Sequence, residues 1–397
     1  MSHFHHGSGC LFTMPTIPST IEMIQQLVAR PSVSSTHPDL DQGNIGAVSL
    51  LAQWLEGLGF AVSLQHLPDL PDKVNMVATL GTGPGGLVLA GHADTVPCNP
   101  ELWHSDPFVA VIRDARLHGL GSCDMKGFLA LATTAAASWA GRAPRHPLTI
   151  VATADEETSM DGARLLHMTG CPGMAVVLGE PTGMKPVRMH KGIMMERIVL
   201  EGEAGHSSNP ALGRNAIDGM AEMLQVLVEY RRQMGRQYAN PAFAVHEPTM
   251  NLGYIHGGDN PNRICPRCEL HFDVRLNPGM DAARIRRDIE ERLRPIATRL
   301  DLQLTLESLT PPIEPMETSA AAPIVKAIEA LTGTPAGAVA FATEAPFFNA
   351  MGCQSIVFGP GRIETAHQAD EYLELTTIEP MLHHLNTLIK SFCYEPT

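Results

Sequence analysis

The chain has 397 residues, of which 44% are hydrophobic, and it carries a formal net charge of −14. This length exceeds that of a typical single hydrophobic core, so we expect two domains. The negative charge argues against nucleic acid and anionic membrane surfaces as partners. No apolar run approaches the roughly 20 residues that a membrane-spanning helix needs.

The N-terminus and the cysteines carry few functional signals. Residues 1–16 contain three histidines but no basic region followed by an apolar core, so we expect an unstructured tail and no signal peptide. Either Met1 or Met14 fits as the start of translation. Cys265 and Cys268 form one C-x-x-C pair without a second pair, which favours a structural role over a zinc site. This cysteine usage is typical of a reducing cytoplasm.

Helix and strand patterns alternate in the first part of the chain. Apolar residues at helical spacing predict helices at residues 20–29, 44–60 and 125–141. Short apolar runs of the kind buried in parallel sheets predict strands at residues 86–92, 148–155 and 175–181. This alternation indicates an α/β domain.

The middle of the chain has a different order of elements. The patterns predict a strand, a helix, two strands, a helix and a strand, at residues 195–204, 215–234, 249–257, 268–276, 282–300 and 302–309. This β-α-β-β-α-β order is the ferredoxin-like split motif. Helix, strand and helix patterns then return at residues 322–333, 355–361 and 378–392. We therefore predict an α/β catalytic domain with a mixed, largely parallel sheet (17–193 and 310–397) and an inserted ferredoxin-like α+β domain (194–309).

Several acids and histidines occur just after predicted strands, and one acid occurs just before a predicted helix. The residues concerned are His92, Asp124, Glu157, Glu180 and His367. In open α/β sheets, sites form outside the carboxyl ends of the strands, so we expect these side chains to converge. Imidazole and carboxylate ligands suit zinc, cobalt or manganese. With Asp124 bridging, the set would hold two metal ions about 3.5–4 Å apart.

Each of these residues also has an ordinary structural interpretation. His92 would be a hydrogen-bonded core histidine, Asp124 a helix cap, Glu180 a turn residue and His367 a surface histidine. Their joint placement at one rim of the sheet favours the metal site.

Three further acids complete the predicted site. Asp94 follows His92 by two residues and is placed to accept the second imidazole N–H, with a turn residue as the alternative. In the run Asp155-Glu156-Glu157, Glu157 serves as a ligand, and Glu156 is not needed as one. Glu156 can therefore take the proton of a metal-activated water and pass it to a leaving amine. Asp155 either orients its neighbours or is solvated.

Five stretches resemble the co-catalytic metallohydrolases that include aminoacylases, glutamate carboxypeptidases and succinyl-diaminopimelate desuccinylases. They are LAGHADTVP, GLGSCDMKG, TADEETS, LGEPT and AHQADEY. The resemblance covers nearly the whole chain after Ile17 and implies the same five ligands, with Glu156 as the acid/base. It also implies two divalent ions per subunit and hydrolysis of an N-acyl amino acid, N-acetylornithine in particular.

The resemblance assigns roles to residues of the inserted domain as well. It implies that His206 stabilises the oxyanion, often from the partner subunit of a homodimer, and that Asn262 and Arg275 hold the substrate carboxylate. A helix cap, a turn and a surface ion pair are the respective alternatives. The distal ammonium of the substrate needs an acid, for which Glu344 and Asp259 are candidates, with solvated loops as the alternative.

Two competing hypotheses remain open from the sequence. The first is a deacylase or dipeptidase for another N-acyl amino acid, such as acetylcitrulline, succinyl-diaminopimelate or a dipeptide. The second is a non-catalytic metal-binding protein on the same fold. The presence of Glu156 together with all five ligands favours an enzyme.

Overall fold

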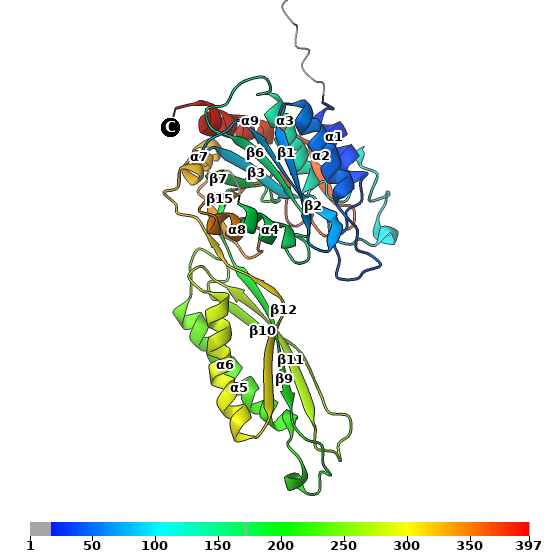
Figure 1. Ribbon diagram of the computed structural model, residues 1–397, viewed down its shortest axis with the longest axis vertical. Helices are drawn as coiled ribbons and strands as arrows, with labels where there is room; N and C mark the ends of the chain where they lie inside the picture. The colour runs from blue at the N-terminus through cyan, green and yellow to red at the C-terminus, as the bar shows by residue number, and fades with distance from the viewer. Residues whose placement is uncertain (1–16, 171–172, 397) are drawn as a thin grey trace, which may run out of the picture. The chain divides into compact units, whose positions relative to one another are not determined.

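The computed structural model describes residues 17–170 and 173–396. The histidines of the N-terminal tail and both candidate start methionines lie outside these residues. The chain forms two compact units, one built from residues up to Met184 and from Phe358 onward, and the other from Lys185–Val357 (Figure 1). Among the described helices, none has the length and apolar character required to cross a bilayer.

The first unit is built on a mixed sheet in which the strands lie in the order β1-β2-β6-β3-β7. Their bounds are β1 Ala61–Leu67, β2 Leu70–Leu80, β3 Leu87–His92, β6 Leu148–Thr153 and β7 Ala175–Leu178. β3 pairs in parallel with β6 and β7, whereas β2 pairs antiparallel with β1 and β6. β3, β6 and β7 are buried along their whole length, as continuous apolar strands of a parallel sheet should be. The prediction of a mixed, largely parallel sheet is confirmed.

Five α-helices of the first unit accompany this sheet: α1 Thr20–Val28, α2 Ile45–Gly57, α3 Lys126–Ala137, α4 Asp161–Thr169 and α9 Ile378–Ile389. The first begins at a capping box, because Ser19 accepts from the Glu22 N–H and the Glu22 carboxylate accepts from the Ser19 N–H. α3 packs against β3 and β6. A Cβ on Gly179, just after β7, would lie 1.9 Å from the Phe128 ring of α3, so only glycine permits this approach.

A small three-stranded sheet also belongs to the first unit. It consists of β4 Val111–Arg113, β5 Arg116–His118 and β16 Tyr372–Glu374. The unit contains short helices as well, at Pro100–Leu102 and Leu375–Thr377, and α9 continues as a π-helix at Lys390–Tyr394. The sequence patterns predicted α1, α2, α3 and α9 but missed the β1–β2 hairpin, α4 and this small sheet.

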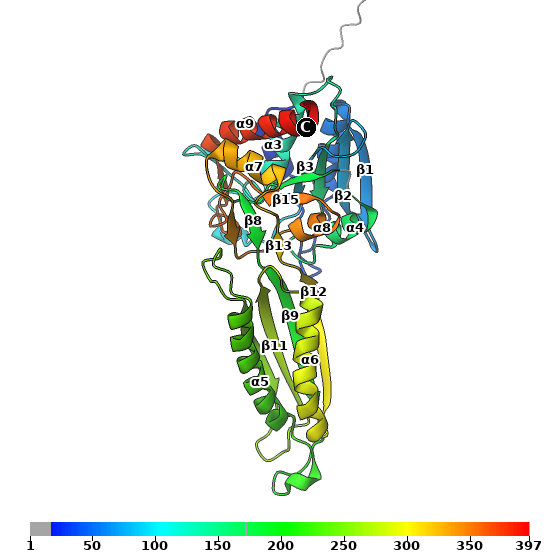
Figure 2. The same ribbon diagram turned by 90° about the vertical axis from the view of Figure 1, so that its left-hand side faces the viewer.

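The second unit contains the predicted split motif. Its elements are β9 Gly192–Glu201, α5 Ala216–Gln237, β10 Thr249–Gly257, β11 Arg267–Leu276, α6 Ala282–Arg299 and β12 Gln303–Ile313. The four strands form an antiparallel sheet in the order β10-β11-β9-β12. Figure 2 shows α5 and α6 side by side against this sheet. Alternate β11 residues such as Leu270, Phe272 and Val274 are buried in the core that the helices cover.

The same unit extends beyond both ends of the motif. It also contains the strands β8 Val187–His190, β13 Met316–Glu317, β14 Gly337–Val339 and β15 Gln354–Val357 and the helices α7 Pro323–Thr332 and α8 Ala345–Ala350, with a short 3-10 helix at Pro210–Leu212. β8 pairs with β13, β14 and β15. The limits predicted for the inserted domain, 194–309, remain a prediction.

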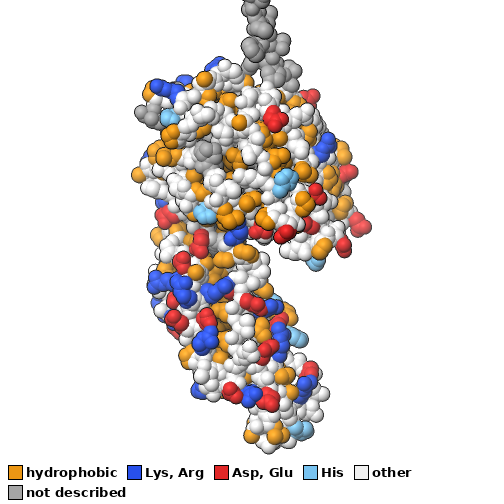
Figure 3. All heavy atoms as spheres, viewed as in Figure 1, with side chains coloured by type: hydrophobic (Ala, Val, Ile, Leu, Met, Phe, Trp, Pro, Cys, Tyr) orange, Lys and Arg blue, Asp and Glu red, His pale blue; other side chains and the backbone are white. Residues whose placement is uncertain are grey.

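The alternating charges of α6 lie on its exposed side. Ile285, Ile289 and Leu293 face the core, whereas Arg287 and Arg294 are exposed. Figure 3 shows blue and red side chains intermixed over the unit that holds this helix. The charged stretch of α6 is therefore a solvated helix face, in which acidic residues accompany the basic ones.

His190, at the end of β8, is buried as a neutral imidazole. Its Nδ1 donates to the Lys191 carbonyl at 3.0 Å, and its Nε2 accepts from the Thr343 hydroxyl at 3.0 Å. Burial lowers the pKa of His190 to about 4, although the hydrogen bond to Lys191 opposes this shift. The imidazole thus joins β8 to the segment that precedes α8.

We expect His190 to make the metal-free protein sensitive to mild acid. The folded-state pKa lies below the unfolded value of about 6.5, so the unfolded chain binds the extra proton as the pH falls from about 6.5 to 4. Stability should then fall by up to ~1.4 kcal/mol per pH unit from this group. Urea unfolding at pH 7 and pH 5 measures the effect, and His190→Gln should reduce the loss by about 2 kcal/mol. An unchanged pH dependence in this variant would contradict the assignment.

Candidate metal and catalytic site

The five predicted ligands all belong to the first unit, four of them near the ends of its elements and His367 in the loop before β16. His92 is the last residue of β3, Glu157 follows β6, and Glu180 follows β7. Parallel pairing places His92 opposite Thr153, so the loop after β6 begins beside the imidazole. Asp124 lies in the loop before α3. That helix starts at Lys126 without any side-chain cap, which excludes the helix-cap alternative for Asp124.

Asp124 lies between two imidazoles. Its Oδ1 is 3.0 Å from His92 Nε2, and its Oδ2 is 3.4 Å from His367 Nε2. Each imidazole has a further carboxylate beside it, Glu180 at 4.0 Å from His92 and Glu157 at 3.0 Å from His367. The cluster therefore consists of two imidazole–carboxylate pairs that share one aspartate, as a bridged pair of metal ions requires.

The charges of the cluster favour a bound cation. Burial opposes protonation of His92, but the hydrogen bond to Asp124 and the charges of Glu156 and Glu180 raise its pKa well above the ordinary value. Hydrogen bonds to Asp124 and Glu157 raise the pKa of His367 to about 10. Both shifts favour the positively charged form of the imidazole, because the surrounding carboxylates need positive charge nearby. Metal ions would supply that positive charge instead, so the donor set fits them.

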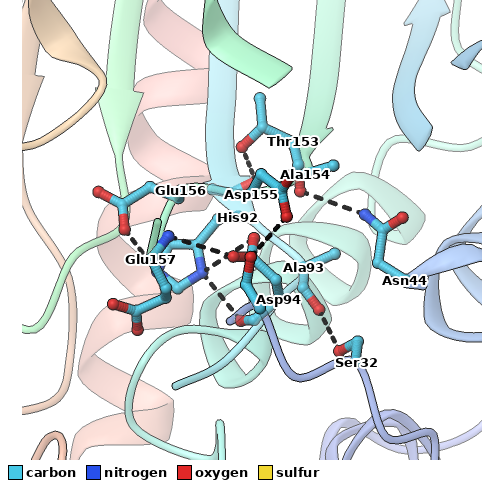
Figure 4. A network of polar contacts seen from close by, with 12 residues as sticks. Ser32, Asn44, His92, Ala93, Asp94, Thr153, Ala154, Asp155, Glu156 and Glu157 are labelled. Atoms are coloured by element: carbon cyan, nitrogen blue, oxygen red, sulfur yellow. Dashed lines mark hydrogen bonds and ion pairs between the residues drawn. The ribbon is translucent and has the colours of Figure 1, made fainter. Parts of the chain in front are cut away.

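Figure 4 shows Asp94, Glu156 and Glu157 around the His92 ring. The imidazole Nδ1 donates to the backbone carbonyl of Asp94 at 3.0 Å, and the Asp94 carboxylate lies 3.8 Å from the same nitrogen. That carboxylate also accepts from the Glu157 N–H at 3.2 Å. Asp94 thus orients His92 mainly through its backbone, and its side chain holds the loop that carries Glu157.

The side chain of Glu156 also lies near the His92 imidazole. Its Oε2 lies 4.0 Å from His92 Nε2, and its side chain is 10% exposed. Glu156 is therefore as close to the His92 imidazole as Glu180 is, and its side chain is partly open to solvent. The geometry is compatible with proton transfer by Glu156.

Asp155 is buried, and the solvated alternative for it is wrong. Its carboxylate accepts from the Ser34 hydroxyl at 2.5 Å and pairs with Lys73 at 2.6 Å. Lys73 also pairs with Asp41 at 2.7 Å. Asp155 has a φ of 59°, in the left-handed region, so the backbone turns at this residue directly before the two glutamates. Its partners lie far away in sequence, so no local signal identified them.

The substrate-binding candidates lie in the second unit. His206 and Asn262 are neighbours there, because His206 forms a β-bridge with Arg263 and the Ser207 N–H donates to the Asn262 carbonyl at 3.1 Å. The imidazole of His206 is exposed, and its Nδ1 lies 2.8 Å from the Ser208 hydroxyl.

Arg275 and the two candidate acids have partners within the same unit. Arg275 points away from the helix-covered face of β11 and donates to Asp273 at 3.0 Å. Glu344 is buried at the N-cap of α8. Asp259 pairs with Arg263 at 2.6 Å on the surface. An exposed ion pair of this kind makes Asp259 the weaker candidate for an ammonium site.

Comparisons with known proteins agree with this fold. A model of the peptidase family M20/M25/M40 matches residues 88–391. Acetylornithine deacetylase from Proteus mirabilis is 44% identical over 379 residues, 95% of this chain and 97% of that protein. The Edwardsiella ictaluri protein of the same name is 46% identical over 378 residues, 95% of this chain and 98% of its own length.

Solved structures share the fold at low identity. Aminopeptidase PepT from Bacillus cereus matches with a TM-score of 0.73 and 16% identity over 94% of this chain and 97% of its own. The Bacillus subtilis YXEP protein, described as a dinuclear metal binding peptidase, matches with a TM-score of 0.65 and 13% identity over 93% and 97% of the two chains.

The fold and the relatives together define a metallohydrolase that acts on amide bonds. The chain belongs to the peptidase family M20/M25/M40. The resemblance to the co-catalytic metallohydrolases is thereby confirmed.

We expect Lys73→Met to destabilise the protein by about 3–5 kcal/mol, because it leaves Asp155 buried without its cation. Urea unfolding measures the loss, and Lys73→Met/Asp155→Asn should recover part of it, since the buried charge is then removed as well. Lys326→Met is the matched control, because its pair with Glu329 is exposed and should contribute less than about 1 kcal/mol. Equal losses in the two single variants would contradict the importance of the buried pair.

Proposed function

We propose that this protein removes the acetyl group of N2-acetyl-L-ornithine to give L-ornithine and acetate, a step of arginine biosynthesis. The observation that carries the proposal is the cluster in which Asp124 lies between His92 and His367 with Glu156 at its edge. The relatives named acetylornithine deacetylase, at 44–46% identity over nearly the whole chain, support this choice of substrate.

The donor set suits two divalent ions: His92 and Glu180 would hold one, His367 and Glu157 would hold the other, and Asp124 would contribute to both. Zinc and cobalt fit these ligands best, and manganese is also compatible. When bound, the ions supply Lewis acidity toward the amide carbonyl and lower the pKa of a water to near 7.

Glu156 performs the proton transfers in this proposal. It accepts a proton from the attacking water and later donates it to the nitrogen of ornithine as the C–N bond breaks. The carboxylate suits both roles because it lies beside the imidazole of His92 at the edge of the cluster. Asp94 and Asp155 keep the two adjacent glutamates in place through the loop contacts described above.

Residues of the second unit would bind the rest of the substrate. Arg275 offers a planar fork of donors to the α-carboxylate, and Asn262 adds a hydrogen bond. The imidazole of His206 would stabilise the oxyanion that forms at the acetyl carbonyl. Glu344 is the candidate partner for the distal ammonium.

We also propose a homodimer formed through the unit that holds β9–β12 and a location in the cytoplasm. In the described parts of the chain, Cys98, Cys123, Cys265, Cys268 and Cys393 are free thiols, which supports a reducing compartment.

The decisive experiment measures ornithine release from N-acetylornithine by protein loaded with zinc or cobalt. A panel of acetylcitrulline, succinyl-diaminopimelate and dipeptides, compared by kcat/KM, distinguishes the alternatives. Faster turnover of another member would reassign the substrate while keeping the reaction class. Metal binding without hydrolysis of any member would support the non-catalytic hypothesis.

We expect Glu156→Ala to bind both ions as the wild type does and to lose on the order of a thousandfold or more in kcat, because the proton acceptor is removed while the ligands remain. Metal content by elemental analysis and steady-state kinetics provide the two measurements. Glu101→Ala, at an exposed glutamate outside the cluster, is the control and should be unaffected. Near-normal turnover of Glu156→Ala would refute its role.

A further inference from the structure

One buried carboxylate ties two of the ligand loops together. Glu371 is 2% exposed, and its Oε1 accepts from the backbone N–H of Cys123 at 2.8 Å and of Asp124 at 3.0 Å. Its own carbonyl accepts from the Gly119 N–H at 3.0 Å. Glu371 follows His367 by four residues on the same loop. A single side chain therefore connects the loop of His367 to the backbone of the aspartate that both imidazoles share.

This contact satisfies a buried acid directly from the backbone of the Asp124 loop. Burying a carboxyl group is costly unless donors satisfy it, and here two backbone N–H groups do so. Here the acceptor bonds the N–H of the ligand residue itself, so it fixes the point from which the Asp124 side chain extends.

His367 is the ligand that most needs such support. Its side chain is 49% exposed, and its φ of 58° lies in the left-handed region. The loop has other attachments as well: the Asp370 carboxylate accepts from the His104 N–H at 2.9 Å, and the Thr365 hydroxyl lies 3.2 Å from Cys123 Sγ. Among the described contacts of this loop, however, the carboxylate of Glu371 is the one that holds the Asp124 backbone.

We propose that Glu371 is a positioning residue that couples Asp124 to the loop of His367, so that both imidazole–carboxylate pairs share the aspartate at a fixed spacing. The inference rests on the metal site of the proposed function. Partners that orient ligands typically contribute 10–100-fold to metal affinity. We expect the ion held by His367 and Glu157 to depend on Glu371 most strongly, because that half of the site lies on the loop that would be released.

Two substitutions of Glu371 distinguish the effect of its side-chain length from the effect of its charge. Glu371→Gln keeps the length of the side chain and an oxygen that can accept from both N–H groups, whereas Glu371→Asp keeps the charge but shortens the reach by about 1.5 Å. Asp370→Asn serves as the matched control on the same loop. Titration calorimetry with zinc and the absorption spectrum of the cobalt-loaded protein report the affinity of each ion and its coordination. Thermal unfolding of the metal-free variants reports folding.

We expect Glu371→Asp to weaken the second ion 10–100-fold and to alter the cobalt spectrum, while Glu371→Gln and Asp370→Asn stay within about threefold of the wild type. If Glu371→Gln instead weakened metal binding and Glu371→Asp did not, the positioning role would be overturned and the charge of Glu371 would be the cause. An equal loss in Asp370→Asn would show that general loosening of the loop is the cause.

Two further outcomes also decide the question. Lower melting temperatures with unchanged metal binding would reduce Glu371 to a structural residue. Failure of the wild type to release ornithine, with the variants still differing in metal affinity, would overturn the proposed substrate and leave the positioning role standing.

Discussion

The site depends on the position of one carboxylate, that of Asp124. Its two oxygens point at His92 and His367, which come from opposite ends of the chain. Each imidazole brings one more acid, so the spacing of the two halves is set by the aspartate they share. Any shift of its backbone would change both halves together, and this explains why the surrounding loops hold that backbone so firmly.

A site of this kind gathers many acidic side chains, and in this fold different groups stabilise different acids. Asp155 is paired with the buried Lys73. Glu371 is satisfied by backbone N–H groups. The remaining acids converge on the two histidines, where divalent ions would balance them. The acids thus separate into those that build the loops and those that bind cations.

The sequence was most informative where strand ends carry chemistry. Because β3, β6 and β7 are continuous apolar runs, the residues that follow them could be assigned to one rim, and His92, Glu157 and Glu180 do lie there. The roles of two acids close to the predicted ligands, Asp155 and Glu371, could not be predicted from the sequence. Asp155 has its cation on a distant strand, and the acid four positions after His367 bonds to a loop nearly 250 residues earlier. No periodicity encodes such contacts.

The sequence by itself determined the fold class and the split β-α-β-β-α-β motif, and it predicted the five candidate donors, because burial patterns and motif residues are local properties of the chain. The tertiary structure alone decided which oxygen of Asp124 faces which imidazole, and that the backbone of Asp94 is the nearer acceptor for His92. It also decided that buried Asp155 and Glu371 hold the loops. These outcomes follow from distances between residues remote in sequence, which only the closed loops fix.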